Sequence, residues 1–274
     1  LNQYLLTDKR YFHNASGTLG MQYHISPNIH WKSNIGLAWR APSANELYSD
    51  GVHHGSGTYE VGNIDLNPEK GLKWVNTFAY TTDRFQASID LYGQLIYGYI
   101  YAQAQPDSAR QTIRGTFPLF AYKQQDARFY GTDIQLKYKL LSNINYQATL
   151  SIVRAKNITS GDYLPDIPAD RFQHSLQWFP RGLQMEKTFL QLSHRAVARQ
   201  KRYTPDSDYA APPAGYHLFD MDIATAVMLG KQELAIALQA DNLFNLSYKD
   251  YMDRFRYYAH QQGRNFSLKL SYNF

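Results

Sequence analysis

The last ten residues, Asn265-Phe-Ser-Leu-Lys-Leu-Ser-Tyr-Asn-Phe274, alternate strictly between polar and apolar side chains. A period of two residues places the two sets on opposite faces of a β-strand. The same alternation recurs at 85–91, 134–140 and 144–152. No comparable stretch has the 3.6-residue period of an amphipathic helix, so the sequence predicts an all-β fold.

The lengths of the connections between strands are the second signal. We predict eleven strands, near residues 14–25, 31–40, 70–80, 84–101, 117–140, 144–156, 168–179, 186–199, 215–229, 233–241 and 263–274. Short turns alternate with long connections at 41–69, 102–116, 157–167, 200–214 and 242–262. Short turns on one side and long loops on the other are typical of a transmembrane antiparallel β-barrel. The apolar face would meet lipid, and the polar face, which includes Asp220 and Asp222, would line the lumen.

Aromatic residues favour the same interpretation over a soluble sandwich. Trp31 and Trp39 bracket one predicted strand, and eight tilted strand residues separate them by roughly 20 Å of height. Trp74 falls near the loop end of its strand, and Tyr80 and Trp178 fall near turn ends. Aromatic residues at these levels are typical of the girdles at the two membrane interfaces.

Composition and motifs exclude several other classes. The chain of 274 residues has no cysteine, so it contains no disulfide framework and no thiolate chemistry. No apolar run approaches the 18 residues of a membrane-spanning helix. The net charge of +5 is scattered and forms no basic stripe, which argues against a nucleic-acid partner. The G-x-S-x-G, H-E-x-x-H and Gly-rich phosphate-loop patterns are absent, so we predict no enzymatic activity.

The strand count predicts an incomplete barrel. Bacterial single-chain barrels have an even number of strands, and an antiparallel barrel whose first and last strands run in the same direction cannot close. Eleven strands are half of the 22 found in plugged outer-membrane transporters. We therefore expect that residues 1–274 do not close alone. If residues 1–10 contain a further strand, a closed twelve-stranded pore is the alternative.

Several separated motifs resemble the TonB-dependent outer-membrane receptor family. They are Trp39, Arg40, Ala41 and Pro42, then Asn63, Ile64, Asp65 and Leu66, then 127–134, 241–245, 254–257 and 263–266, and the terminal Phe274. The resemblance implies that residues 1–274 are the C-terminal part of a 22-stranded barrel, with the N-terminal plug and the first barrel half outside this sequence. It also implies the outer membrane of a Gram-negative bacterium, contact with its lipid and lipopolysaccharide, and a TonB-type energising protein as partner. Phe274 would be read by the barrel-assembly machinery, so we expect its deletion to reduce insertion.

Within the family, the first two motifs are similar to the boxes of haem receptors and a related zinc receptor, which flank a ligating histidine. Here His53 and His54 lie between the boxes, and the resemblance implies that one of them ligates haem or a metal. Side chains of neighbouring extended residues diverge, so one histidine is expected to dominate. Glu60 is a candidate carboxylate ligand for zinc. The alternative is that all three are solvated loop residues.

Arg254 and Arg256 are candidates for contact with an anionic substrate such as the haem propionates. They would otherwise contact lipopolysaccharide phosphates or hold the last long loop. No cofactor is required, and haem or a metal ion would be the transported ligand. The functional prediction is therefore active uptake of a metal complex, with haem or another iron or zinc species first. A passive porin-like channel and, more remotely, a soluble β-rich binding module are the alternatives.

Overall fold

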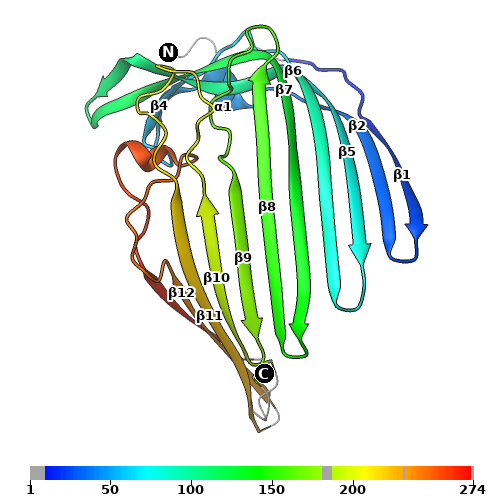
Figure 1. The fold of residues 1–274 in the computed structure, drawn as a ribbon. Helices are drawn as coiled ribbons and strands as arrows, with labels where there is room; N and C mark the ends of the chain where they lie inside the picture. The colour runs from blue at the N-terminus through cyan, green and yellow to red at the C-terminus, as the bar shows by residue number, and fades with distance from the viewer. Residues whose placement is uncertain (1–9, 181–186, 231, 273–274) are drawn as a thin grey trace.

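The computed structural model describes residues 10–180, 187–230 and 232–272 of the chain. These residues form a strongly curved antiparallel sheet that has the shape of an open half-barrel (Figure 1). The strands of this wall pair in the order in which they follow one another along the chain, β1-β2-β5-β6-β7-β8-β9-β10-β11-β12-β13, and β3 and β4 lie off this path. This up-and-down order confirms the predicted all-β barrel wall.

The wall contains the eleven predicted strands. They are β1 (Gly17–Ser26), β2 (Ile29–Arg40), β5 (Glu69–Thr81), β6 (Phe85–Thr112), β7 (Gly115–Leu141), β8 (Ile144–Asn157), β9 (Arg171–Trp178), β10 (Phe189–Val197), β11 (Tyr216–Leu229), β12 (Gln232–Asp241) and β13 (Asn265–Tyr272). Within the described residues, β1 and β13 do not pair with each other, as expected for a wall that does not close alone. Residues 1–9, which cover nearly all of the segment that a twelfth strand would occupy, and Phe274 lie outside the described residues.

The predicted connection at 102–116 is wrong, because this segment belongs to one long hairpin. β6 continues to Thr112 and β7 begins at Gly115. Residues 105–108, which include Pro106, form a bulge in β6 opposite Leu119 alone. Tyr209 fills the bulge, since its hydroxyl contacts the Gln105 carbonyl at 2.6 Å and the Leu119 amide at 2.6 Å. An irregular stretch can therefore remain inside a strand when a side chain from elsewhere satisfies its backbone groups.

The long connection at 41–69 is folded. It contains the short helix α1 (Ala44–Tyr48) and the hairpin of β3 (Asp50–His53) and β4 (Thr58–Val61). Ser43 and Glu46 form a capping box at the start of α1. Residues 59–61 of β4 pair in parallel with 119–121 of β7, which fixes the hairpin against the wall.

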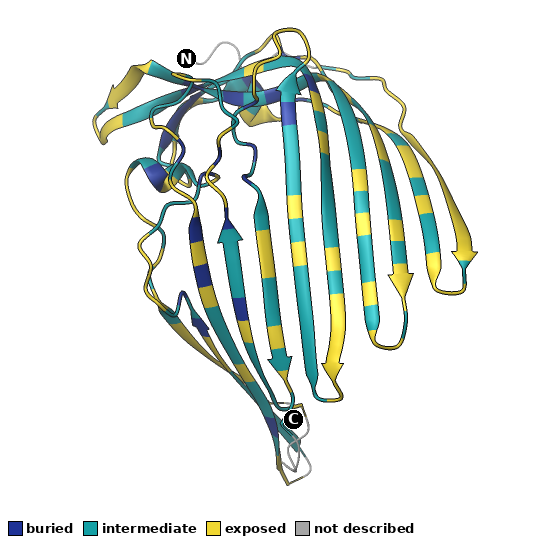
Figure 2. Cartoon of the chain, viewed as in Figure 1, coloured by how far each residue is buried: buried dark blue, intermediate teal, exposed yellow. Residues whose placement is uncertain are grey.

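The two faces of the wall differ as the alternation predicts. Leucines and aromatic residues on the outward face are widely exposed, and Phe266 and Leu268 of β13 each retain 65% of their surface. Such a continuous exposed apolar face has no protein cover and fits a lipid environment. Buried residues concentrate at the loop end of the sheet (Figure 2). In the described part of the chain, no helix is both long and apolar enough to cross a membrane.

The outward tryptophans explain two polar residues on the apolar face. The indole N–H of Trp31 donates to Asn76 Oδ1 at 3.1 Å, and that of Trp74 donates to Ser33 Oγ at 2.8 Å. A buried or lipid-facing indole N–H needs an acceptor, so each polar side chain serves the ring on the neighbouring strand.

Candidate ligand-binding site in the loop cap

At the loop end of the wall, the connections pack into what we call the loop cap. It consists of α1, β3, β4, the 3₁₀ helix η1 (Arg254–Tyr257), and the connections 157–170, 198–215 and 242–264. The extended ends of β6 and β7 pass beneath it. All five residues predicted to contact a ligand lie in this region.

In the β3–β4 hairpin, a series of side-chain hydrogen bonds runs from His53 through two hydroxyl groups to Glu60. His53 Nδ1 lies 3.0 Å from Ser56 Oγ, which lies 2.7 Å from Thr58 Oγ1. Thr58 Oγ1 donates to Glu60 Oε1 over 3.4 Å. His53 is exposed, whereas Thr58 and Glu60 are buried, so the series leads from the surface into the loop cap.

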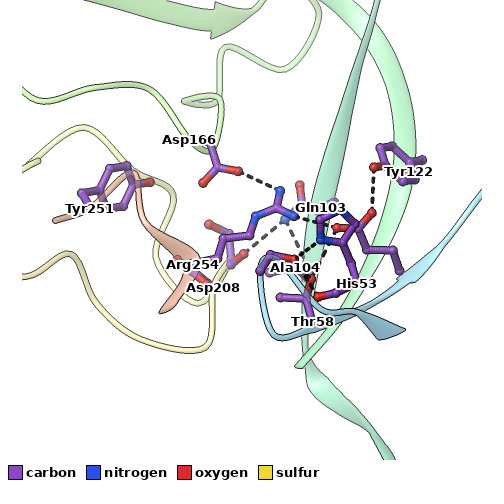
Figure 3. Close-up of polar contacts among 12 residues, drawn as sticks. His53, Thr58, Gln103, Ala104, Tyr122, Asp166, Asp208, Tyr251 and Arg254 are labelled. Carbon is purple, nitrogen blue, oxygen red and sulfur yellow. Dashed lines mark hydrogen bonds and ion pairs between the residues drawn. The ribbon is translucent and has the colours of Figure 1, made fainter. Parts of the chain in front are cut away.

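Glu60 and Arg254 are brought together, although 194 residues separate them. Figure 3 shows Arg254 with its contact to Asp166, and Tyr122 and Thr58 on the other side of the guanidinium. Arg254 Nη1 contacts Glu60 Oε1 at 3.3 Å, and its Nη2 contacts Asp166 Oδ2 at 3.1 Å. Tyr122 donates to the second oxygen of Glu60 at 2.9 Å. The guanidinium also stacks over the Phe120 ring at 4.4 Å. We call Glu60, Arg254 and Asp166 the carboxylate clasp, and it has two carboxylates for one cation.

Arg256 is buried within the loop cap rather than presented to solvent. Its guanidinium pairs with Asp208 and donates to the backbone carbonyl of Tyr251. It also lies over the rings of Tyr251 and Tyr257, at 4.6 and 4.9 Å. Burial, together with the nearby Asp166 carboxylate, raises the pKa of Tyr251 to about 12, and burial also raises the pKa of Tyr257. The predicted role of Arg256 in substrate contact stays a prediction, but its geometry is that of a loop anchor.

The two adjacent histidines have different partners, as expected for neighbouring residues at the end of a strand. His54 Nε2 lies 3.1 Å from Arg114 Nη1, at the tip of the β6–β7 hairpin. His53 uses Nδ1 toward Ser56, and its Nε2 has no hydrogen-bond partner among the residues that the structure describes. The turn of the β3–β4 hairpin has a further contact that involves neither histidine, because the Tyr258 hydroxyl donates to the Gly57 carbonyl at 2.5 Å.

The family-type motifs support this geometry. Arg40 pairs with Glu46 at 2.7 Å and with Glu69 at 2.9 Å, which joins α1 to the ends of β2 and β5. Burial alone would raise the pKa of Glu46, but hydrogen bonds from Arg40 and Ser43 outweigh it and the pKa is lowered. The remaining motif residues lie on either side of the β3–β4 hairpin, next to β2 and α1. Trp39 precedes Arg40 in β2, Ala41 and Pro42 lead to the helix cap, Asn63 Oδ1 accepts from the Asp65 amide, and Leu66 is buried beside Leu47.

Sequence reasoning missed the side chains that pair with Glu60, Arg254 and Arg256. Tyr122, Asp166 and Asp208 lie in three different connections or strands, and no short motif marks them. Within residues 10–180, 187–230 and 232–272, no group of three or more histidine, cysteine, aspartate or glutamate residues is arranged to hold a metal ion.

Comparison with known proteins agrees with this architecture. The family model described as "TonB dependent receptor-like, beta-barrel" matches residues 2–246. The chain therefore belongs to the TonB-dependent receptor β-barrel family, and its barrel is a component of the outer membrane of a Gram-negative bacterium. This family consists of transport receptors, which removes the soluble-module alternative.

Solved structures share the fold at low sequence identity. The copper transporter OprC is 21% identical with a TM-score of 0.73, and the match covers 93% of this chain and 38% of that one. The siderophore receptor PirA from Acinetobacter baumannii is 14% identical with a TM-score of 0.67, covering 94% and 40%. The FrpB iron transporter from Neisseria meningitidis is 14% identical with a TM-score of 0.65, covering 94% and 39%. The chain thus spans about two-fifths of the length of these proteins.

Proposed function

We propose that this chain is part of an outer-membrane receptor for active uptake of a metal complex, with haem as the first candidate and His53 as the iron ligand. The observation that carries the proposal is the orientation of His53. Ser56 Oγ holds Nδ1 at 3.0 Å, and the ring stands exposed at the end of β3. Metal-ligating histidines typically give their second nitrogen to an oxygen partner, which fixes the tautomer and turns Nε2 outward.

A single imidazole is sufficient for this role. Haem iron is held by one or two axial protein ligands, whereas a zinc ion usually needs three or four. His54 is a weaker candidate because Arg114 donates to its Nε2, which occupies the more accessible ring nitrogen. Zinc remains the alternative cargo, with Glu60 as its carboxylate only if the pair with Arg254 opens.

The carboxylate clasp suggests how ligand binding would reach the rest of the loop cap. His53 is linked through Ser56 and Thr58 to Glu60, and Glu60 is paired with Arg254 of the last long connection. A ligand that displaces His53 would therefore strain contacts between two connections that are far apart in the sequence. Energy for transport would come from a TonB-type inner-membrane partner, acting on the plug of the complete receptor.

The test compares histidine variants of the complete receptor in a strain that lacks other haem receptors. His53→Ala is expected to reduce growth on haem as sole iron source about tenfold or more, since it removes the axial nitrogen. It should also abolish the Soret shift of haem added to the purified receptor. His54→Ala should lower uptake less than twofold, and Ser56→Ala should give an intermediate value.

His260→Ala is the matched control, because His260 is also exposed and lies in the loop cap. Barrel yield should be the same for all four variants. If His53→Ala and the double variant with His54→Ala bind and import haem and zinc at the wild-type rate, the ligand proposal fails. A non-haem iron chelate would then be the better candidate cargo.

A further inference from the structure

The outward face of the wall has a groove where a side chain is missing. Two rows of outward positions cross β5, β6, β7 and β8. The upper row is Trp74, Gly93, Tyr130 and Arg154, and the lower row is Asn76, Leu91, Thr132 and Ile152. Since Gly93 has no side chain, the upper row is interrupted between Trp74 and Tyr130. The residues of both rows line a groove of about 690 Å³ at this position.

The residues around Gly93, at the floor of the groove, leave room for a side chain at this position. A Cβ atom placed on Gly93 would meet nothing within 4 Å. By contrast, a Cβ on Gly131 of the next strand would collide with the Tyr92 hydroxyl and the Ile152 carbonyl. Gly131 is therefore explained by packing inside the wall, whereas Gly93 leaves an open apolar channel on the lipid side.

Two cations stand directly above the groove. The next outward row toward the loop side contains Arg128 of β7 and Lys156 of β8, which are paired opposite each other. Like charges in this position repel, so the arrangement is unfavourable without an anion. Neither residue has an ion-pair partner in the described part of the chain, and the Lys156 ammonium lies 4.7 Å over the Tyr163 ring. Two strand residues separate this row from Tyr130 and Arg154, about 6.6 Å along the strand.

The other charges near the groove are already matched or directed elsewhere. Arg154, at the top of the groove, pairs with Asp170 at 2.5 Å, and Arg202 approaches the same carboxylate at 3.8 Å. Asp126 is the outward position next to Arg128, and it accepts the Gly98 amide at 2.8 Å. Even with the negative charge of Asp126 counted, Arg128 and Lys156 leave the mouth of the groove with a net positive charge.

From this juxtaposition we infer that the β5–β8 face is a docking site for the lipid A part of lipopolysaccharide. Its phosphate lies against Arg128 and Lys156, and one acyl chain occupies the groove over Gly93. Long loops mark the outer side of the membrane, so these cations stand at the headgroup level of the outer leaflet. An apolar groove continuous with a cation pair fits a phosphorylated lipid with acyl chains. The inference does not depend on which cargo the receptor transports.

The experiment uses the complete receptor, purified in detergent, stripped of lipid, and titrated with bis-phosphorylated lipid A under native mass spectrometry. The double variant Arg128→Gln/Lys156→Gln is expected to weaken lipid A binding about tenfold, because it removes both cations. Gly93→Leu is expected to weaken it by a similar factor, because the leucine fills the groove while the charges remain. Lipid A carrying brominated acyl chains should quench Trp74 fluorescence, measured as the difference between wild type and Trp74→Phe.

Matched controls separate this site from general effects. Arg84→Gln/Lys139→Gln removes two exposed cations at the opposite, short-turn side, and Gly17→Leu adds the same side chain at another open outward position. Neither should change binding by more than about twofold. Dephosphorylated lipid A should bind wild-type receptor about tenfold more weakly, a result that requires no variant to fold. The inference is overturned if phosphatidylglycerol binds as tightly as lipid A, or if dephosphorylation, Arg128→Gln/Lys156→Gln or Gly93→Leu leaves affinity within twofold.

Discussion

The barrel wall and the loop cap are held together in opposite ways. In the wall, every strand pairs with the strand next to it in the sequence, and the register is set by backbone hydrogen bonds and alternating faces. In the loop cap, the decisive contacts join residues such as Glu60 and Arg254, or Gly57 and Tyr258, which are 194 and 201 residues apart. The Glu60–Arg254 pair is mostly buried, and a buried charge is costly when it is left unpaired.

This difference predicts two units of unequal robustness. The wall is a repetitive structure whose backbone groups must be satisfied because lipid surrounds it. The loop cap depends on a few charged pairs, so removal of one partner should loosen the cap and leave the wall intact. Four changes, in order of decreasing effect, break or sharpen the comparison.

Replacement of Arg256 should have the largest effect. Arg256→Met leaves the Asp208 carboxylate without its cation in a mostly buried site, which should destabilise the loop cap by about 3–5 kcal/mol. Proteinase K digestion of intact cells should then cleave connections 198–215 and 242–264, while the heat-modifiable barrel band on SDS gels is unchanged. Lys187→Met, which breaks an exposed pair with Glu233, is the control. Loss of the barrel band in Arg256→Met would mean that cap and wall unfold as one unit.

Alkaline pH should loosen the cap next. The pKa of Tyr251 is raised to about 12 by burial and by Asp166. An unfolded cap would release this proton near pH 10, so the stabilisation is fully present below pH 10 and is lost as the pH rises toward 12. The full loss, reached above pH 12, should be roughly 2–3 kcal/mol, and about half of it should be present at pH 11, seen as faster proteolysis of the cap at pH 11 than at pH 9. Tyr251→Phe should reduce this dependence, and an unchanged pH profile would count against it.

A steric change in the wall should come third. In Gly131→Ala, the new Cβ would collide with the Ile152 carbonyl oxygen and with the Tyr92 hydroxyl. The overpacking should cost about 1–3 kcal/mol and lower the temperature at which the SDS-resistant barrel unfolds. Gly93→Ala, on the neighbouring strand, meets nothing and should change stability by less than about 0.5 kcal/mol. Equal unfolding temperatures for both variants would contradict the packing argument.

The helix cap should give the smallest effect. Ser43→Ala removes the hydroxyl that accepts the Glu46 amide, and capping changes of this kind cost about 1 kcal/mol. The loss should appear as faster hydrogen exchange in α1 only, with the Arg40–Glu46 pair retained. Asn45→Ala, on the same helix, is the control. Equal exchange rates in wild type and Ser43→Ala would show that the Arg40 pair alone holds the helix.

The sequence by itself determined the wall. The two-residue period of segments such as 265–274 fixes which side chains share a face, and short turns fix which strands are neighbours. These are local properties, so the eleven strands and the open half-barrel could be predicted, with ends accurate to a few residues for most strands. The motif segments 39–42 and 63–66 likewise lie at the start and near the end of the folded connection 41–69. The exception was 102–116, where a distant tyrosine allows an irregular stretch to remain in the sheet.

Only the tertiary structure decided how the candidate site is built. The sequence named Glu60, Arg254 and Arg256, but the two arginines turned out to be paired with carboxylates from the cap itself. It did not distinguish His53 from His54, because that choice depends on which hydroxyl or guanidinium reaches each ring. Such contacts join points far apart on the chain, and each is selected by the need of a desolvated charge for a partner. That requirement exists only after the wall has brought the connections together, so no periodic pattern in the sequence records it.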